Sequence, residues 1–378
     1  MNVVVMNYTF DSRIETPEEL LDRYDALSGW CRAVSQAGLS VRLVQAFRRD
    51  AVLRRDGIDF HFCAATAPRA RWVRHMHRCA AAHSPDVVHV NGFDAPVQTW
   101  LLRHAMPDAT AIVVQDHAGV PAGNWIKSTV RRALMREIDG FLFTSKAQAD
   151  PWVQGGFIAS DDVYDVLEAS TSLRPGDRAE ARRSTGVDGS PALLWVARLD
   201  SNKDPITILE GFEHVVDVLP RATLTMIYRD ADLLPPIQRR LQSSRGLGAR
   251  VRLVGAVPHA DLATWYSAAD LFVIGSAREV CGYAVVEACA CGATPIVTDI
   301  PPFRAITSDG AIGRHWLCGD ARSFADAVIA ASGPSPGTDR NGVLEHFAAH
   351  LSWNAVGQRA CAIYESVVAR RRSERQVS

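Results

Sequence analysis

Two cations and two carboxylates in the second half of the chain have the types and spacing that suit a phosphate-bearing ligand. Arg198 and Lys203 lie five residues apart, just after an apolar run at residues 193–196. Arginine can hold two phosphate oxygens in a fork and lysine adds a compact charge, so the pair suits a diphosphate. Such cations help most when a departing diphosphate gains charge in a transition state. The simpler alternative is two surface charges in a strand–helix loop.

Glu279 and Glu287 lie eight residues apart in a segment with the pattern of a strand, a loop and a helix. Gly282 falls near the expected helix start, where backbone N–H groups lack helical partners and the helix dipole favours an anion. A glycine there also lets a ligand approach the backbone closely. Glu287 suits a ribose diol and Glu279 a sugar hydroxyl. An ordinary solvated role is disfavoured for Glu287, because its neighbours are apolar and an unpaired buried charge is costly.

The elements that must position these residues follow from the hydrophobic pattern. Short β-branched runs alternate with amphipathic stretches, which is typical of parallel sheets covered by helices on both faces. The expected strands of the first half are residues 3–7, 41–45, 59–62, 87–90, 111–115, 140–143 and 163–167. Those of the second half are residues 192–196, 223–228, 251–254, 271–274 and 294–297. The expected helices include residues 17–36, 70–82, 95–104, 206–216 and 353–369.

A stretch rich in Pro, Gly, Ser and charge at residues 172–190 predicts a boundary between two domains of similar size, as the length of 378 residues also does. We expect one doubly wound, Rossmann-like domain at residues 1–172 and a second at 173–352. Residues 353–378 are expected to form a C-terminal helix that crosses back to the first domain, ending in a solvated tail at residues 370–372. Ligands of such sheets bind beyond the carboxyl ends of the strands, so the domains are expected to face each other across a cleft.

Composition excludes several classes of protein. The chain is 47% hydrophobic and 22% charged, as in soluble globular proteins, and its net charge of -1 argues against binding to nucleic acid. The first residues lack the pattern of a signal peptide, and no apolar run approaches the ~20 residues of a membrane span, so a cytoplasmic protein is expected. The eight cysteines show neither C-x-x-C nor zinc spacing, and we expect reduced, buried thiols and no metal site.

The segment around Glu279 and Glu287 resembles the E-x7-E signature of retaining glycosyltransferases of the GT-B fold, above all glycosyltransferase family 4. The resemblance covers roughly residues 193–306 and includes Arg198 and Lys203 at the family's usual spacing. The motifs are specific jointly, whereas E-x7-E alone is a weak signal. The resemblance implies transfer of a hexose-type sugar from a nucleoside-diphosphate sugar, with retained configuration and with neither a metal nor another cofactor.

The resemblance also implies a role for each residue of the site. Arg198 and Lys203 would bind the donor diphosphate, Glu287 its ribose and Glu279 the transferred sugar. The residues implied to contact the donor are Arg198, Lys203, Val257, Glu279, Cys281, Gly282, Tyr283, Ala284 and Glu287. His117 follows an expected strand and would contact the donor sugar from the first domain, although a lone histidine is more often structural. The residues expected to act in catalysis are His117, Arg198, Lys203 and Glu279.

The first half of the chain departs from the family pattern. Many relatives carry a Gly-Gly loop after the first strand, whereas residues 9–17 contain no glycine. Ser12, Arg13 and Thr16 are the candidates for a phosphate- or acceptor-binding loop, with the Arg13 side chain replacing backbone donors. The acceptor stays open between a small molecule, a glycan and a lipid-linked molecule. Basic stretches at residues 69–78 and 127–136 would suit peripheral contact with an anionic membrane, yet solvated helix faces explain them more simply.

Two further functions remain compatible with these residues. One is another enzyme on the same architecture, a nucleotide-sugar epimerase or a phosphorylase, and the other is a non-catalytic nucleotide-sugar-binding protein. Detection of a transferred glycoside would separate the first from glycosyl transfer, and turnover would exclude the second. A nicotinamide dehydrogenase is disfavoured because no G-x-G-x-x-G follows a strand, and a phosphate-loop nucleotidase because no G-x-x-x-x-G-K-[ST] occurs.

Overall fold

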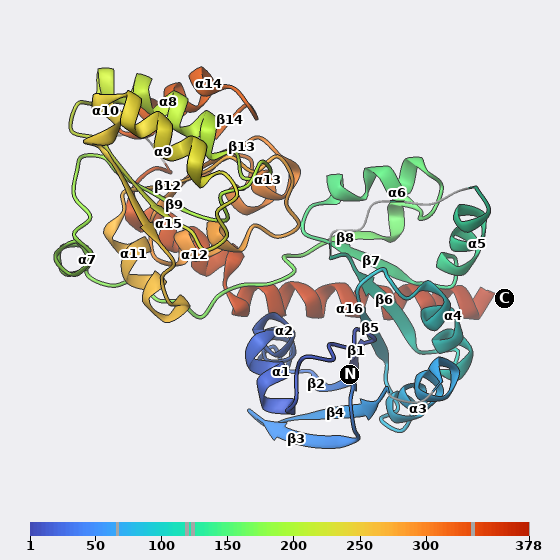
Figure 1. Ribbon diagram of the computed structural model, residues 1–378. Helices are drawn as coiled ribbons and strands as arrows, with labels where there is room; N and C mark the ends of the chain where they lie inside the picture. The colour runs from blue at the N-terminus through green and yellow to red at the C-terminus, as the bar shows by residue number, and fades with distance from the viewer. Residues whose placement is uncertain (66–67, 118–120, 122–124, 334–336, 378) are drawn as a thin grey trace. The chain divides into compact units, whose positions relative to one another are not determined.

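The computed structural model of the chain describes residues 1–378 except 66–67, 118–120, 122–124, 334–336 and 378, and leaves the side chains of residues 125–127, 245 and 375–377 undescribed. The chain forms two compact units, Met1–Ser170 with Trp353–Ser378, and Thr171–Ser352. The boundary between the two units, after Ser170, therefore lies two residues before the boundary expected from the sequence. The C-terminal segment belongs to the first unit. Each unit is an α/β structure built on its own sheet (Figure 1).

The sheet of the first unit has eight strands in the order β3-β4-β2-β1-β5-β6-β7-β8. The strands are β1 (Asn2–Asn7), β2 (Ser40–Phe47), β3 (Ala51–Arg55), β4 (Ile58–Ala64), β5 (Val87–Asn91), β6 (Ala111–Gln115), β7 (Gly140–Phe143) and β8 (Val163–Asp165). β3 was not expected, and it pairs with β4 in the antiparallel sense, so the prediction of a wholly parallel sheet is wrong at this edge. The reason is a tight hairpin at Asp56 and Gly57, which both have positive φ angles, of 54° and 78°.

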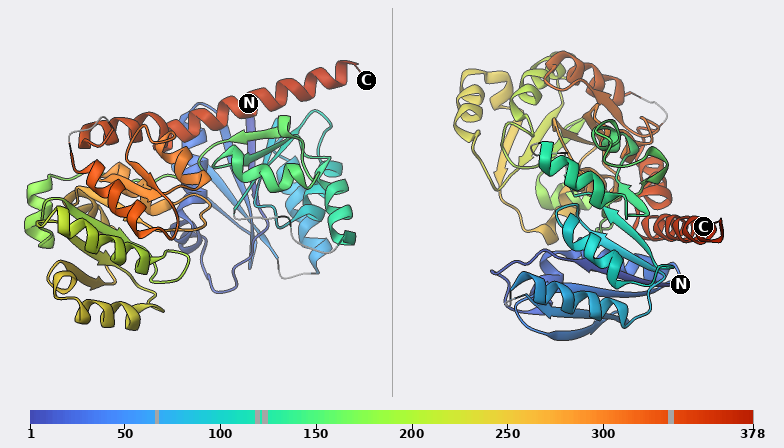
Figure 2. Two further views of the ribbon diagram at one scale, coloured as in Figure 1. Left: turned by 90° about the horizontal axis from the view of Figure 1, so that it is seen from above. Right: turned by 90° about the vertical axis from the view of Figure 1, so that its right-hand side faces the viewer.

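The helices of the first unit are α1 (Pro17–Arg23), α2 (Asp25–Gln36), α3 (Arg69–Ala81), α4 (Pro96–Ala105), α5 (Trp125–Met135), α6 (Asp150–Gln154) and α16 (Trp353–Val377). The single helix expected at residues 17–36 is wrong, because Tyr24 leaves the helical conformation with φ -109° and ψ 57° and separates α1 from α2. α16 is a long, straight helix that packs along α2 (Figure 2).

The expectation of a solvated tail at residues 370–372 is also wrong, because α16 continues through this segment. Arg370 lies 2.8 Å from the Asp162 carboxylate, and Arg371 forms an ion pair with Asp139. The side chains of Arg371 and Asp139 are only 19% and 9% exposed. A carboxylate as buried as that of Asp139 needs cationic partners, and Arg371 of α16 joins Arg103, which lies 3.7 Å from it, in supplying them.

The sheet of the second unit has six parallel strands in the order β11-β10-β9-β12-β13-β14. The strands are β9 (Ala192–Val196), β10 (Thr223–Ile227), β11 (Val251–Gly255), β12 (Leu271–Ile274), β13 (Thr294–Thr298) and β14 (Arg314–Trp316). The chain order runs outward from β9 to β11 on one side and from β12 to β14 on the other. This reversal makes the carboxyl ends of β9 and β12 the switch point at which doubly wound sheets bind ligands.

The helices of the second unit are α7 (Arg178–Thr185), α8 (Pro205–Val218), α9 (Leu234–Ser243), α10 (Arg245–Gly248), α11 (Leu262–Ala268), α12 (Tyr283–Ala290), α13 (Pro301–Thr307), α14 (Ala321–Ala331) and α15 (Arg340–His346). Each unit has its own apolar core, with Trp152 fully buried in the first and Trp195 in the second. Among the described residues, no helix combines the length and apolarity needed to cross a membrane.

Candidate functional site

The loops that follow β9 and β12 meet because the two strands are parallel neighbours, and the Ala277 N–H of one loop donates to the Asn202 carbonyl of the other at 2.8 Å. The side chain of Asn202 bridges the loops: its Nδ2 donates to the Arg278 carbonyl at 3.1 Å, and its Oδ1 accepts from the Arg278 N–H at 3.2 Å. A Cβ on Gly275 would lie 2.9 Å from the Lys203 carbonyl oxygen, so the close approach requires glycine. These contacts bring the segments of Lys203 and Glu279 together.

Lys203 and Glu279, two of the predicted site residues, form an ion pair between Nζ and Oε1. Their side chains are only 15% and 14% exposed. The fully buried Ser276 donates its hydroxyl hydrogen to the same carboxylate oxygen at 2.6 Å, and the Lys203 N–H donates to Asp200 at 3.0 Å. The sequence did not identify Ser276 as a site residue, since a serine in a loop carries no distinctive signal. The Lys203 ammonium and the Glu279 carboxylate are thus held together in a largely buried site.

Arg198 lies on the same loop as Lys203 but is far more accessible. Its side chain is 59% exposed, and its Nε lies 3.3 Å from the carboxylate of Asp200. An exposed ion pair of this kind holds a side chain only weakly, so the guanidinium can reorient at little energetic cost. At the carboxyl edge of β9, Lys203 is thus a largely buried cation and Arg198 an exposed one.

Glu287 is buried on α12, at 8% exposure, as its apolar neighbours predicted. Its Oε2 accepts from the Tyr266 hydroxyl at 3.0 Å, and its Oε1 lies 2.7 Å from Nε2 of His259. Burial raises the pKa of Tyr266 well above its ordinary value, so this hydroxyl keeps its proton and donates. The two partners lie 28 and 21 residues away in the sequence, which is why spacing did not reveal them. Each carboxylate oxygen retains a lone pair for a further donor.

Gly282 precedes the first turn of α12 with a positive φ of 69°, in the left-handed region that favours glycine. A Cβ at this position would lie 2.6 Å from Cε1 of Phe303, so the packing excludes any larger residue. Gly282 is the N-cap residue of α12 and itself contributes no side-chain cap. The other residues implied to contact the donor are the buried Cys281, the half-buried Val257 and Ala284, and the exposed Tyr283.

His117 belongs to the first unit, whereas the other three residues expected in catalysis belong to the second. It follows β6, and its Nδ1 contacts the Glu168 carboxylate while its Nε2 lies 2.5 Å from Oδ1 of Asn91. Both ring nitrogens thus meet oxygen atoms, which holds the orientation of the ring. Glu168 comes from the segment after β8, for which the sequence suggested no role. Residues 118 and 119, which complete the motif after His117, lie outside the described residues.

The three residues predicted for a phosphate- or acceptor-binding loop make local contacts. Arg13 holds the Asp11 carboxylate through Nε and Nη2 at 2.9 and 2.8 Å, and this contact keeps the pKa of Asp11 well below its ordinary value. Tyr24 donates to the same carboxylate at 2.9 Å. The Thr16 hydroxyl caps α1, and the Ser12 carbonyl accepts from an arginine side chain at 2.8 Å. Side chains of the loop itself, of Tyr24 and of Arg48 therefore shape the loop, while the Arg13 side chain remains 73% exposed.

Comparison with known proteins links the second unit to one enzyme family. Residues 177–332 match the family model of glycosyl transferases group 1. D-inositol 3-phosphate glycosyltransferase 1 of Catenulispora acidiphila is 29% identical over 217 residues, which cover 52% of this chain and 49% of that protein. Mannosylfructose-phosphate synthase of Agrobacterium fabrum is 31% identical over 202 residues, 50% of this chain and 43% of that protein. The chain thus spans about half the length of these curated relatives.

Solved structures show the same fold over nearly the whole chain. Sucrose-phosphate synthase from Thermosynechococcus elongatus superimposes with a TM-score of 0.68 and 17% identity, covering 98% of this chain and all of that one. HepE from Anabaena, solved in complex with UDP, gives a TM-score of 0.70 and 15% identity, covering 97% and 100%. At such identities the likeness concerns the fold alone. The match to the glycosyl transferases group 1 family is thus confined to residues 177–332, while the chain has the GT-B fold of two Rossmann-like domains.

Proposed function

We propose that the chain is a retaining glycosyltransferase that moves a hexose-type sugar from a nucleoside-diphosphate sugar to an acceptor, with no metal at its donor site. The observation that carries this proposal is the partly enclosed Lys203–Glu279 ion pair at the carboxyl edge of β9 and β12. This pair lies within the residues that match the glycosyl transferases group 1 family. Further support comes from HepE, which has the same fold and was solved with UDP and with UDP-glucose.

In the proposed donor complex, the ion pair marks the junction between phosphate and sugar. The Lys203 ammonium has three N–H donors, so it can hold Glu279 and a phosphate oxygen together. Arg198 adds a second cation that is exposed enough to turn toward the ligand. Glu279 then faces the sugar hydroxyls, and Glu287 accepts from the ribose diol through its remaining lone pairs. The start of α12 at Gly282 offers backbone N–H groups and the positive end of the helix dipole to the diphosphate.

The proposed reaction breaks the bond between the anomeric carbon and the diphosphate oxygen and forms a bond from that carbon to the acceptor oxygen. The proton of the acceptor hydroxyl moves to the departing diphosphate, and attack from the same face retains the configuration. Lys203 and Arg198 stabilise the charge that develops on the diphosphate, and the site positions the reactants. His117, whose ring is held by Glu168 and Asn91, is proposed to contact the sugar from the first unit.

Calorimetric titration of the full chain with nucleoside diphosphates tests the donor site. Arg198→Ala and Lys203→Ala are each expected to weaken binding about 10–100-fold, because each removes a charge-assisted hydrogen bond of about 1.5–3 kcal/mol. Arg322→Ala is a matched control, because this side chain on α14 is 72% exposed and forms an ion pair with Asp326 at 3.2 Å. Unchanged affinity in both Arg198→Ala and Lys203→Ala would sink the assignment.

Product analysis with a panel of nucleoside-diphosphate hexoses tests the reaction itself. A glycoside of retained configuration is expected, and Glu279→Gln should keep donor binding while losing turnover. Release of an epimerised nucleotide sugar or of a sugar phosphate would indicate the epimerase or phosphorylase alternatives. Donor binding without turnover on any acceptor or on water would indicate a binding protein.

A further inference from the structure

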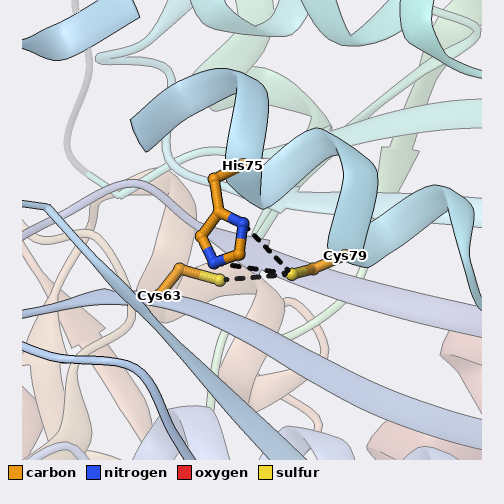
Figure 3. A group of neighbouring side chains, drawn as sticks. All are labelled: Cys63, His75 and Cys79. Carbon is orange, nitrogen blue, oxygen red and sulfur yellow. Dashed lines mark hydrogen bonds between the residues drawn. The ribbon is translucent and has the colours of Figure 1, made fainter. Parts of the chain in front are cut away.

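Two cysteines and a histidine, none of them assigned to the donor site, converge in the first unit (Figure 3). Cys63 lies on β4, and His75 and Cys79 project from α3 toward it. The two sulfur atoms are 3.7 Å apart, and the Cys79 sulfur lies 3.9 Å from Nε2 of His75. One potential ligand atom from each residue lies within 4.8 Å of the other two. The spacing of cysteines and histidines in the sequence did not predict this group.

The convergence follows from how α3 packs on the sheet. His75 and Cys79 are four residues apart, so they occupy one face of the helix. That face meets β4, where Cys63 is 1% exposed and belongs to the apolar core. Cys79 is half-buried, and the His75 side chain is 36% exposed. The group thus extends from the core to the surface, which leaves an entry path for an ion from solvent.

The distances match those between the ligands of a tetrahedral metal ion. Zinc binds sulfur at about 2.3 Å and imidazole nitrogen at about 2.0–2.1 Å, so a tetrahedral site has S···S and S···N separations of about 3.8 and 3.5 Å. The observed 3.7 Å between the Cys63 and Cys79 sulfurs and 3.9 Å from Cys79 to His75 differ from these by a few tenths of an ångström. Two of the three separations thus lie close to those of a zinc site, and the ligand atoms of Cys63 and His75 lie within 4.8 Å of each other.

Asp50 completes the polar surroundings of this group. Its Oδ1 lies 3.1 Å from Nε2 of His75 and accepts the Ala64 N–H at 2.8 Å, so the carboxylate is anchored beside the ring. Three protein ligands leave the fourth position of a tetrahedron for a water molecule or for this carboxylate. A negative charge beside the imidazole also favours a bound cation.

We propose that Cys63, His75 and Cys79 bind a zinc ion that links β4 to α3. Thiolate and imidazole donors favour zinc over magnesium or calcium, which prefer oxygen ligands. The ion would clamp a helix to β4, the strand next to the edge of the first unit's sheet, a structural role independent of the proposed sugar transfer.

Metal titration of the full chain tests this proposal. Protein stripped by a chelator under a thiol reductant is titrated with zinc against a chromophoric competitor, and one equivalent per chain is expected. Cobalt, used as a spectroscopic substitute, should give thiolate-to-metal charge-transfer absorption and the visible bands of a tetrahedral site. His75→Ala and Cys79→Ser should each weaken zinc binding by at least about 10–100-fold. Losses of that size follow when a residue that only hydrogen-bonds to a metal ligand is removed, so removal of a ligand itself should cost no less. Cys318→Ser, which alters an exposed thiol of the second unit, should bind zinc as the wild type does.

Heating provides a second readout: zinc should raise the melting temperature of the wild type and leave that of His75→Ala unchanged. His75 is partly exposed, so its variant is expected to fold, and circular dichroism verifies this before titration. The proposal is overturned if zinc does not bind in stoichiometric amount, or if His75→Ala and Cys79→Ser bind it as tightly as the wild type. A Cys63–Cys79 disulfide that forms in air whether or not zinc is present would also overturn it.

Discussion

Replacing Lys203 by methionine should reveal how differently two ion pairs, whose cations share one loop, contribute to stability. The side chains of Lys203 and Glu279 are 15% and 14% exposed, whereas those of Arg198 and Asp200 are 59% and 22% exposed. Removing one partner of a fully buried pair costs about 3–5 kcal/mol, and exposed pairs contribute about 0–1 kcal/mol. Because the Lys203–Glu279 pair keeps some contact with solvent, we expect about 2–3 kcal/mol for Lys203→Met, discounted from the fully buried value.

The measurement is the melting temperature of the second unit, Thr171–Ser352. In a domain of about 150–250 residues, 1 kcal/mol shifts the melting temperature by about 2–4 °C, so Lys203→Met should lower it by about 4–12 °C. The double variant Lys203→Met/Glu279→Gln should lose less than the two single variants together, because no unpaired charge remains. Arg322→Met, in the same unit, is the control: its side chain is 72% exposed, and its effect should stay within about 0.5 kcal/mol.

Differential scanning calorimetry at pH 7 supplies these values, with circular dichroism as a check on the fold. A shift for Lys203→Met no larger than for Arg322→Met would refute the reasoning, as would simple additivity in the double variant. Arg198→Ala provides the converse case, because it should weaken nucleoside diphosphate binding and leave the melting temperature nearly unchanged. A large thermal effect of Arg198→Ala would mean that exposure is a poor guide to the role of this arginine.

Three further predictions concern the same units. Tyr266→Phe removes the hydroxyl that donates to Glu287 at 3.0 Å, and it should lower the free energy of unfolding in urea by about 1.5–3 kcal/mol. A variant as stable as the wild type would contradict the view that the buried carboxylate requires this hydrogen bond. Gly282→Ala should cost about 1–3 kcal/mol or more through strain and a clash, and Gly319→Ala, with positive φ but open space, should cost less. Burial lowers the pKa of His89 to about 3, so the folded state keeps this ring neutral. The contribution of the neutral ring to the free energy of unfolding is then fully present above about pH 6.5. It decreases as the pH is lowered, by about 2 kcal/mol at pH 5, and His89→Gln should flatten this slope in unfolding experiments.

Local sequence pattern was sufficient for the strands that are buried on both faces. β6, β7, β9 and β12 have the bounds expected from the sequence, because such strands are continuous apolar runs ended by polar or small residues. The pattern failed where burial is partial: β3 is a half-exposed edge strand, and β14 has only three residues. The sequence did not predict the break between α1 and α2 at Tyr24, because the helical periodicity of apolar residues continues across it.

The sequence by itself also determined which residues of the second unit could serve a donor, since the position of Lys203, Glu279 and Glu287 relative to strand ends is a local property. Only the tertiary structure decided that Lys203 contacts Glu279, because this depends on β9 and β12 being neighbours. The partners of Glu287 and the meeting of Cys63 with α3 arise in the same way. Periodicity encodes which side of an element is buried, whereas sheet order and helix packing decide which buried side chains meet.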